Sequence, residues 1–279
     1  MSEGALESWL HAWRESHPQL EAAWVFLRAD PRHQIYGAFA ALEQEWLDAV
    51  YAIREPHVAA VKLQWWREEM QLARSGAARH PLTQTVFTDE RARAIPAPLW
   101  NEALEAAMLA LDSAPAADLS AQLAAARPLH GLLARIETAL WFGADADPER
   151  AQAVVVAQHG VELMRHLPDE IEQGRAPLPM ALLARHGLSL AELANDSAAR
   201  RAALRDQAGA LRQALAETDK MTGPLSLFRG MQMRLDRRAL RRAQAASDPL
   251  CALQAGQGGF RRLLDAWGAA RTWHRASQP

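Results

Sequence analysis

Four side chains that can bind a metal ion or transfer a proton follow one another at helical spacing in the middle of the chain. His159, Glu162, His166 and Asp169 are separated by three, four and three residues, so a helix would place them on one face. Mixed imidazole and carboxylate ligands suit a transition metal better than magnesium, which prefers oxygen. The alternative is the water-facing side of an amphipathic helix, and Pro168 is expected to end that helix before Asp169.

A second group of carboxylates lies in the N-terminal third. Glu43, Glu45 and Asp48 fall within two turns of an expected helix that also carries apolar residues. Glu45 and Asp48 are three residues apart and can point to the same side. The pair is therefore a candidate binding site, again with a solvated helix face as the alternative.

Helices must position both groups. Alanine, leucine, arginine, glutamate and glutamine dominate the composition, and β-branched runs are nearly absent, which predicts an all-α protein. Proline and aspartate at the expected helix starts set several of the boundaries. We expect helices at about 6–16, 18–28, 31–53, 56–74, 99–111, 119–142 (kinked or restarted at Pro128), 148–167, 198–220, 225–246 and 259–273, with a loop or irregular segment at 80–98.

Length and composition limit the organisation. The 279 residues are 49% hydrophobic, enough for one large core, and no linker divides them, so we expect one domain covering 1–279. No apolar stretch is long enough to span a bilayer, and the N-terminus is too acidic and amphipathic for a secretory signal. The single cysteine, Cys251, favours a reducing compartment. We expect a cytoplasmic protein, either free or peripheral to the inner membrane.

Charge is distributed unevenly along the chain. Residues 225–279 contain ten arginines, three aspartates and no glutamate, although the whole chain has a net charge of −2. This basic segment is either a solvated helix surface or a contact for an anionic membrane, an acidic protein partner or a diphosphate. Its densest part holds Arg234, Arg237, Arg238, Arg241 and Arg242. We expect no nucleic acid partner.

The segment EPHVAAVKLQWWREEM, from Glu55 to Met70, resembles the squalene/phytoene synthase family. The preceding RHQIYGAFAALEQEWLDAVYAI, the later HGVELMRHLPDEIEQGRAPLP and the C-terminal FRGMQMRLDRRALRRAQ and GGFRRLLDAWGAAR extend the resemblance over most of the chain. It implies an isoprenoid (terpenoid) synthase-like helical bundle with a central cavity. It also implies farnesyl or geranylgeranyl diphosphate as substrate and Mg²⁺ as cofactor if the protein is catalytic.

Active members of this family carry two aspartate-rich motifs that hold magnesium. The first, D-D-x-x-D, aligns with residues 47–51, where only Asp48 retains a carboxylate. The second aligns with Glu162, His166, Asp169 and Glu170, with His166 in place of the central aspartate. The resemblance thus implies Asp48, Glu162, Asp169 and Glu170 as catalytic candidates, and these four with His166 as metal ligands.

The resemblance also implies residues that contact a substrate. They are Glu45, Asp48, Arg175, Trp65 and Trp66. Arg175 lies in the family's G-R-x-x-L-P ending and would shape the diphosphate end of the site, or else only close a loop. Trp65 and Trp66 would line a lipid tunnel, although a Trp pair on a central helix is more often core packing.

Three functions remain open at this level. The degraded motifs favour a non-catalytic lipid-binding or assembly factor, as in a degenerate branch that includes mitochondrial complex I assembly factor 6. The chain-wide resemblance favours an active head-to-head prenyl-diphosphate transferase with altered metal ligands. The third alternative is a helical interaction module that uses the arginine-rich C-terminal face.

Overall fold

The all-α prediction is confirmed by the computed structural model, which describes residues 3–112, 114–256 and 258–277. Within these ranges the elements are α1 (Glu3–Ser16), α2 (Glu21–Leu27), α3 (His33–Tyr51), α4 (Pro56–Arg74), α5 (Pro81–Val86), α6 (Glu90–Ala94), α7 (Ala97–Ala110), α8 (Leu119–Phe142), α9 (Glu149–Arg165), α10 (Leu167–Glu172), α11 (Met180–Arg185), η1 (Ala191–Ala194), α12 (Ala198–Glu217), η2 (Thr218–Lys220), α13 (Leu227–Ala245), α14 (Pro249–Gln254) and α15 (Gly259–Ser277).

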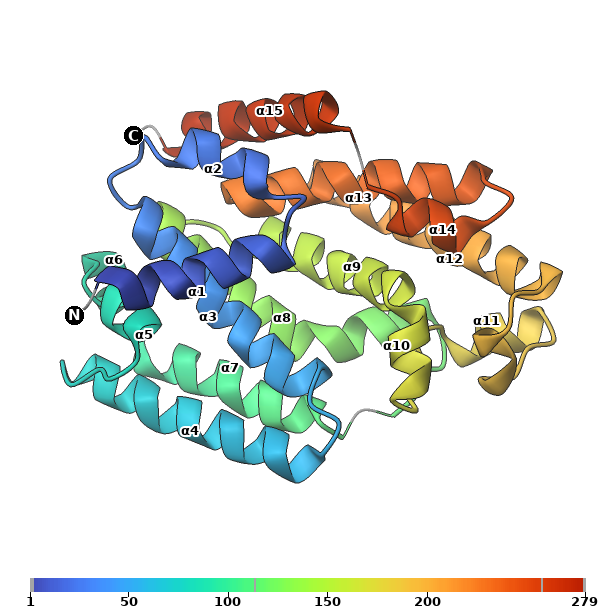
Figure 1. Ribbon diagram of the computed structural model, residues 1–279, viewed down its shortest axis with the longest axis horizontal. Coiled ribbons are helices and arrows are strands. Elements are labelled where there is room, and N and C mark those ends of the chain that lie inside the picture. Colours follow the sequence, from blue (N-terminus) through green and yellow to red (C-terminus); the bar gives the residue numbers. More distant parts are fainter. Residues whose placement is uncertain (1–2, 113, 257, 278–279) are drawn as a thin grey trace.

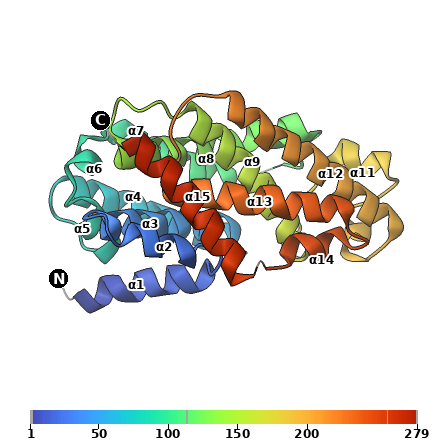
Figure 2. The ribbon, with the colours of Figure 1, turned by 90° about the horizontal axis from the view of Figure 1, so that it is seen from above.

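The helices form a bundle around α3, α8 and α9, which run through its middle (Figure 1). The pair α4 and α7 covers one side of these central helices, and α13 and α15 cover the other. Seen from above, α15 lies across α13 at the surface (Figure 2). Buried apolar side chains form one cluster around α1 to α8 and a second around α9 to α14, and both α8 and α13 contribute to each.

Local signals explain many of the helix starts. The side chains of Asp118 and Ser226 accept hydrogen bonds from backbone N–H groups in the first turns of α8 and α13. Pro56 lies in the first turn of α4, where its missing donor costs nothing. The helices expected at 56–74 and 119–142 are found at those residues, and Pro128 lies inside one continuous α8.

The prediction of an irregular segment at 80–98 is wrong, because it contains α5 and α6. His80 accepts a hydrogen bond from the backbone N–H of Leu82 at 3.3 Å, and Asp89 accepts one from that of Arg91 at 2.7 Å. Each helix spans fewer than two turns, which is too short for an apolar repeat to appear in the sequence. The short α11 and α14 escaped prediction for the same reason.

None of the helices in the described ranges is both long enough and apolar enough to cross a membrane.

Candidate functional site

A cavity of about 830 Å³ lies between the central helices and the α13–α14 side of the bundle. Its wall combines apolar side chains with polar and charged ones. The lining includes Gln44, Leu47, Asp48 and Tyr51 from α3; His130 from α8; Val155, Gln158, His159, Glu162, Leu163 and Arg165 from α9; Asp169 and Glu170 from α10; Arg229, Gln232, Leu235, Ala239 and Arg242 from α13; and Leu253 from α14. Both candidate segments of the sequence therefore meet at one cavity.

On α3, Asp48 faces the cavity and Glu45 does not. The Nε2 of Gln44 donates a hydrogen bond to Asp48 Oδ1 at 2.6 Å. Burial raises the pKa of Asp48, and this hydrogen bond only partly offsets the effect. Glu45 instead pairs with the Lys62 Nζ on α4 at 2.9 Å. Glu45 and Asp48 were expected to point to the same side, but they meet different neighbours, because α4 packs against the edge of α3 that carries Glu45.

On α9, Glu162 lies at the cavity wall between two basic side chains. It forms an ion pair with Arg165, and its Oε2 lies 3.5 Å from His166 Nε2. Burial alone would raise the pKa of Glu162, but the charge of Arg165 and the hydrogen bonds from His166 and Arg165 outweigh it and lower the pKa to about 2. The Glu162 carboxylate is therefore negatively charged, and the neighbouring Arg165 already offsets that charge.

The helix breaks directly after this pair. α9 ends at Arg165 and α10 starts at Leu167, as expected from Pro168. His166 Nδ1 lies 3.4 Å from Asp169 Oδ2, and the hydrogen bond with Glu162 is the largest cause of the raised His166 pKa. The row predicted for one helical face therefore becomes a rim of Glu162, His166 and Asp169, while His159 lies deeper.

Glu170, the residue that follows this row, is buried against Arg175. The Arg175 Nε and Nη2 donate to the two carboxylate oxygens of Glu170 at 2.6 and 2.8 Å, and Nη2 also donates to the Tyr51 carbonyl at 2.7 Å. Gly174, with a φ of 73°, makes the turn that returns Arg175 to α10. Arg175 thus connects α10 to the end of α3, as well as closing the loop.

Deeper in the cavity, Tyr51, His130 and His159 form an aromatic cluster. Tyr51 Oη and His130 Nε2 are hydrogen-bonded at 3.1 Å, and the His130 and His159 rings stack with centroids 4.2 Å apart. Burial lowers the pKa of His159 to about 4 and that of His130 well below its ordinary value, and it raises the pKa of Tyr51. All three groups are uncharged near neutral pH.

Arg229 forms a second internal ion cluster that sequence reasoning missed. Its guanidinium contacts Glu43, and its Nε donates to Glu137 Oε2 at 2.7 Å. The Ser226 hydroxyl donates to the other Glu137 oxygen at 2.6 Å. Burial is the largest cause of the raised Glu43 pKa, and nearby Glu137 acts in the same direction. Local sequence gave no signal, because the partners come from α3, α8 and α13.

The two tryptophans proposed to line a tunnel lie elsewhere. Trp66 is 1% exposed and packs in the core, whereas Trp65 is 45% exposed on the outside of α4. Neither side chain lines the cavity. The core-packing alternative holds for Trp66.

The cavity retains polar atoms without a partner. Gln158 is buried and lines the wall, and neither its amide nitrogen nor its amide oxygen has a hydrogen-bond partner. The side-chain oxygen of Gln173 is also unpaired there. A ligand with a polar end could satisfy these groups, because unpaired buried amides are costly.

The donor set at the cavity does not fit a magnesium ion. Magnesium prefers several oxygen ligands in octahedral geometry. Here Asp48 is bonded to Gln44, Glu162 to Arg165 and Glu170 to Arg175, and Asp169, the remaining carboxylate of the lining, lies 3.4 Å from His166. Across the described ranges, no group of three or more histidine, cysteine, aspartate or glutamate side chains is placed to hold a metal ion.

Two solved structures with the same fold are synthases. A dehydrosqualene synthase crystallised with a ligand matches with a TM-score of 0.73 and 11% identity, covering 97% of this chain and 98% of its own. Squalene synthase HpnC from Alicyclobacillus acidocaldarius matches with a TM-score of 0.66 and 17% identity, covering 87% of this chain and 92% of its own. These likenesses confirm the helical bundle expected from the sequence.

A search of curated proteins finds no match to this chain. The squalene/phytoene synthase family model, in contrast, matches residues 20–257, which include every cavity segment from α3 to α14. The match covers far more than half of the chain. The chain therefore belongs to the squalene/phytoene synthase family.

Proposed function

We propose that this protein binds an isoprenoid lipid in its central cavity and does not carry out the magnesium-dependent condensation of prenyl diphosphates. The family typically uses Mg²⁺ and binds prenyl diphosphates. The observation that carries the proposal is the pairing of the cavity carboxylates. Glu162 and Glu170 each contact an arginine, and Asp48 contacts an amide.

Electrostatics explains why this pairing argues against catalysis. A diphosphate leaves only if its growing negative charge is neutralised, and losing one preorganised group typically costs about 10²–10³ in rate. Leu47, Tyr51 and His166 stand where aligned family motifs carry aspartates. Arg165 and Arg175 already offset the charge of Glu162 and Glu170, so these two carboxylates attract a metal ion less than unpaired ones would.

The cavity still suits a lipid. Its volume of about 830 Å³ is within the range of ligand pockets, roughly 300–1,000 Å³. Leu47, Val155, Leu163, Leu235 and Leu253 supply apolar wall. The unpaired amide groups of Gln158 and Gln173 supply contacts for a polar head. An isoprenoid chain with an alcohol, quinone or diphosphate end matches this combination of an apolar wall and polar contacts.

A binding role also agrees with the sequence resemblance to the branch of complex I assembly factor 6. The comparisons establish the family, and the branch remains part of the proposal. We place the lipid before a protein partner, because the described cavity gives a lipid a binding surface.

The test combines turnover and binding in one preparation. Purified protein is incubated with radiolabelled farnesyl or geranylgeranyl diphosphate, with Mg²⁺ or Mn²⁺, and with or without reduced nicotinamide cofactor. We expect saturable retention of label without a condensed product. Leu163→Trp, which fills the cavity, should abolish retention, and Leu109→Trp on the exposed side of α7 is the matched control.

Two results would overturn the proposal. A head-to-head product that disappears in Asp48→Ala, or in Asp48→Ala with Glu162→Ala, would establish an active transferase with altered ligands. Equal retention by the Leu163→Trp variant and the wild type would remove the cavity as the lipid site. Circular dichroism on both tryptophan variants would verify that they fold.

A further inference from the structure

The arginines of α13 do not form the free basic face that their sequence density predicts. Arg237 donates to the Leu215 carbonyl at 2.6 Å and to Asp219 at 2.8 Å. Arg238 pairs with buried Asp265 at 2.7 Å. Arg242 donates to the carbonyls of α14 and the residue that follows it. Most of this charge therefore joins neighbouring elements together, and the exposed basic surface lies on α15 instead.

The outward side of α15 is apolar. Phe260, Leu263, Leu264 and Trp267 follow the three-four-seven spacing of one helix face, and all four are exposed, Phe260 by 75% and Trp267 by 50%. The opposite face of α15 buries Ala266, Ala269 and Trp273 against the bundle. None of the four side chains in this outer stripe belongs to either core cluster of the described chain.

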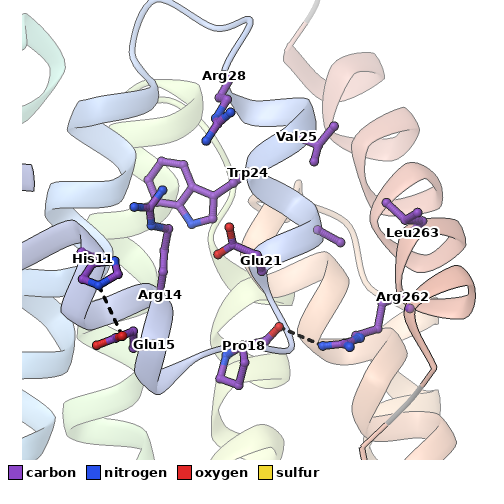
Figure 3. Close-up of a pocket in the computed structure, with 12 residues that line it drawn as sticks. His11, Arg14, Glu15, Pro18, Glu21, Trp24, Val25, Arg28, Arg262 and Leu263 are labelled. Carbon is purple, nitrogen blue, oxygen red and sulfur yellow. Dashed lines mark hydrogen bonds and ion pairs between the residues drawn. The ribbon is translucent and has the colours of Figure 1, made fainter.

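The stripe continues onto α2 across a groove of about 860 Å³. Figure 3 shows Val25 of α2 and Leu263 of α15 on the two walls of this groove. Val25 is also exposed. We call Val25, Phe260, Leu263, Leu264 and Trp267 together the docking face.

Positive charge surrounds the docking face. α15 carries Arg261, Arg262, Arg271 and Arg275, and its one acidic residue, Asp265, is buried against α13. Arg28 stands at the end of α2, and Arg271 lies over the Trp267 ring at 4.8 Å. Glu15 and Glu21 line the groove itself. The exposed side of α15 therefore combines apolar side chains with arginines, and its other exposed polar residues, Thr272, His274 and Ser277, lie towards its C-terminal end.

We propose that the docking face binds the surface of an anionic phospholipid bilayer. Phenylalanine, leucine and tryptophan enter the boundary between headgroups and acyl chains, and flanking arginines pair with lipid phosphates. Another exposed apolar row, Val58, Val61 and Trp65 on α4, lacks this charge bias, because nearby Lys62 and Arg67 pair with Glu45 and Glu105. Charge complementarity thus selects α15 over α4.

The docking face also borders the central cavity. Arg262 and Pro18 line both the cavity and the groove, and the Arg262 Nη1 donates to the Pro18 carbonyl at 3.1 Å (Figure 3). A bilayer bound to α15 would therefore lie next to one edge of the cavity. The docking proposal does not depend on lipid binding in that cavity.

Vesicle sedimentation tests the proposal with the full chain. The vesicles contain equal parts of phosphatidylglycerol and phosphatidylcholine, or phosphatidylcholine alone, with no isoprenoid added. We expect binding to the anionic vesicles, weaker binding at high salt, and at least about tenfold weaker binding for Phe260→Ser with Leu264→Ser. The control is Val61→Ser with Leu109→Ser, which removes two exposed apolar side chains elsewhere and should bind as the wild type does.

A charge test uses the same vesicles. The double variant Arg261→Glu with Arg275→Glu should lose binding. The control is Arg127→Glu with Arg212→Glu, which changes two exposed arginines on α8 and α12 and gives the same net charge. It should retain most of the binding. Equal losses in test and control variants would overturn the proposal, as would no binding by the wild type. A dimer in light scattering that only the α15 apolar variant dissociates, without vesicle binding, would assign the face to self-association instead.

Discussion

Arg175 holds both carboxylate oxygens of Glu170, through Nε at 2.6 Å and Nη2 at 2.8 Å. Glu170 aligns with an acidic position of the family's second motif and is buried, so its charge has to be compensated inside the protein. In this chain an arginine five residues away supplies that compensation. A carboxylate expected to hold a metal ion therefore connects α10 to the end of α3.

The first prediction concerns this pair. Arg175→Met should lower the free energy of unfolding by about 2–4 kcal/mol, because it leaves the Glu170 carboxylate buried without a partner. Urea denaturation followed by circular dichroism measures the change. Adding Glu170→Gln to Arg175→Met should recover part of the loss. A single variant as stable as the wild type would show that Arg175 does not compensate Glu170.

The second prediction concerns magnesium. A ligand at about one hundred times its dissociation constant raises the free energy of unfolding by about 2.7 kcal/mol. Since Asp48, Glu162 and Glu170 are already engaged, we expect millimolar Mg²⁺ to leave the thermal unfolding midpoint unchanged. Differential scanning calorimetry measures it. A rise that disappears in Asp48→Asn would contradict the conclusion that these side chains do not fit the ion.

The third prediction concerns pH. The pKa of His159 is about 4 in the folded protein because burial lowers it, against about 6.5 in the unfolded chain. Between these values the unfolded chain binds the extra proton, so stability falls as pH falls from about 6.5 towards 4. This histidine alone should cost about 2 kcal/mol between pH 7 and pH 5. Buried His130 acts in the same direction.

Comparison with His159→Gln isolates this effect. Urea denaturation at pH 7 and at pH 5 should show a smaller acid-induced loss in the variant than in the wild type. Asp236 has a pKa raised to about 6, mainly by burial, and so contributes stability that is lost as pH rises through that value. It is present in both proteins, so its opposite contribution cancels in the comparison. Equal losses in the two proteins would refute the assignment.

The fourth prediction concerns Arg229. Arg229→Met would leave two buried carboxylates, Glu43 and Glu137, next to each other without a cation, and should cost about 3–5 kcal/mol of stability. Glu43→Gln is the matched contrast. It keeps the pair of Arg229 with Glu137 and removes a carboxylate whose pKa is already raised, so its cost should be about 1 kcal/mol or less. Chemical denaturation measures the loss of unfolding free energy in both variants. Equal losses would show that Arg229 does not compensate the two carboxylates.

Sequence reasoning located the long helices well and the short ones poorly. α4 and α8 were found at the expected residues, because caps, prolines and an apolar repeat all lie within the helix or directly beside it. α5 and α6 were missed, since five or six residues do not establish a repeat. The family was also recognisable from local motifs, and its model covers residues 20–257.

The candidate site was predicted in part. Asp48, Glu162, His166, Asp169 and Glu170 all line the described cavity. Glu45, Trp65 and Trp66 do not, because α3 turns Glu45 towards Lys62 and α4 lies on the far side of α3 from the cavity. Whether the cavity residues bind substrate or metal remains a prediction. Helical spacing gives the relative direction of two side chains, but not which neighbour each one meets.

The sequence by itself determined the helical class, the main helix boundaries and the loss of aspartates from the family motifs. Those properties depend on residues that are close together in the chain. The tertiary structure decided how the remaining carboxylates are neutralised and which face of α15 is left without a partner. Glu43 meets Arg229 from 186 residues away, and such a pairing exists only once α3 and α13 have packed against α8. Burial then determines the charge and pKa of each group, because the cost of a carboxylate depends on the surroundings that folding creates.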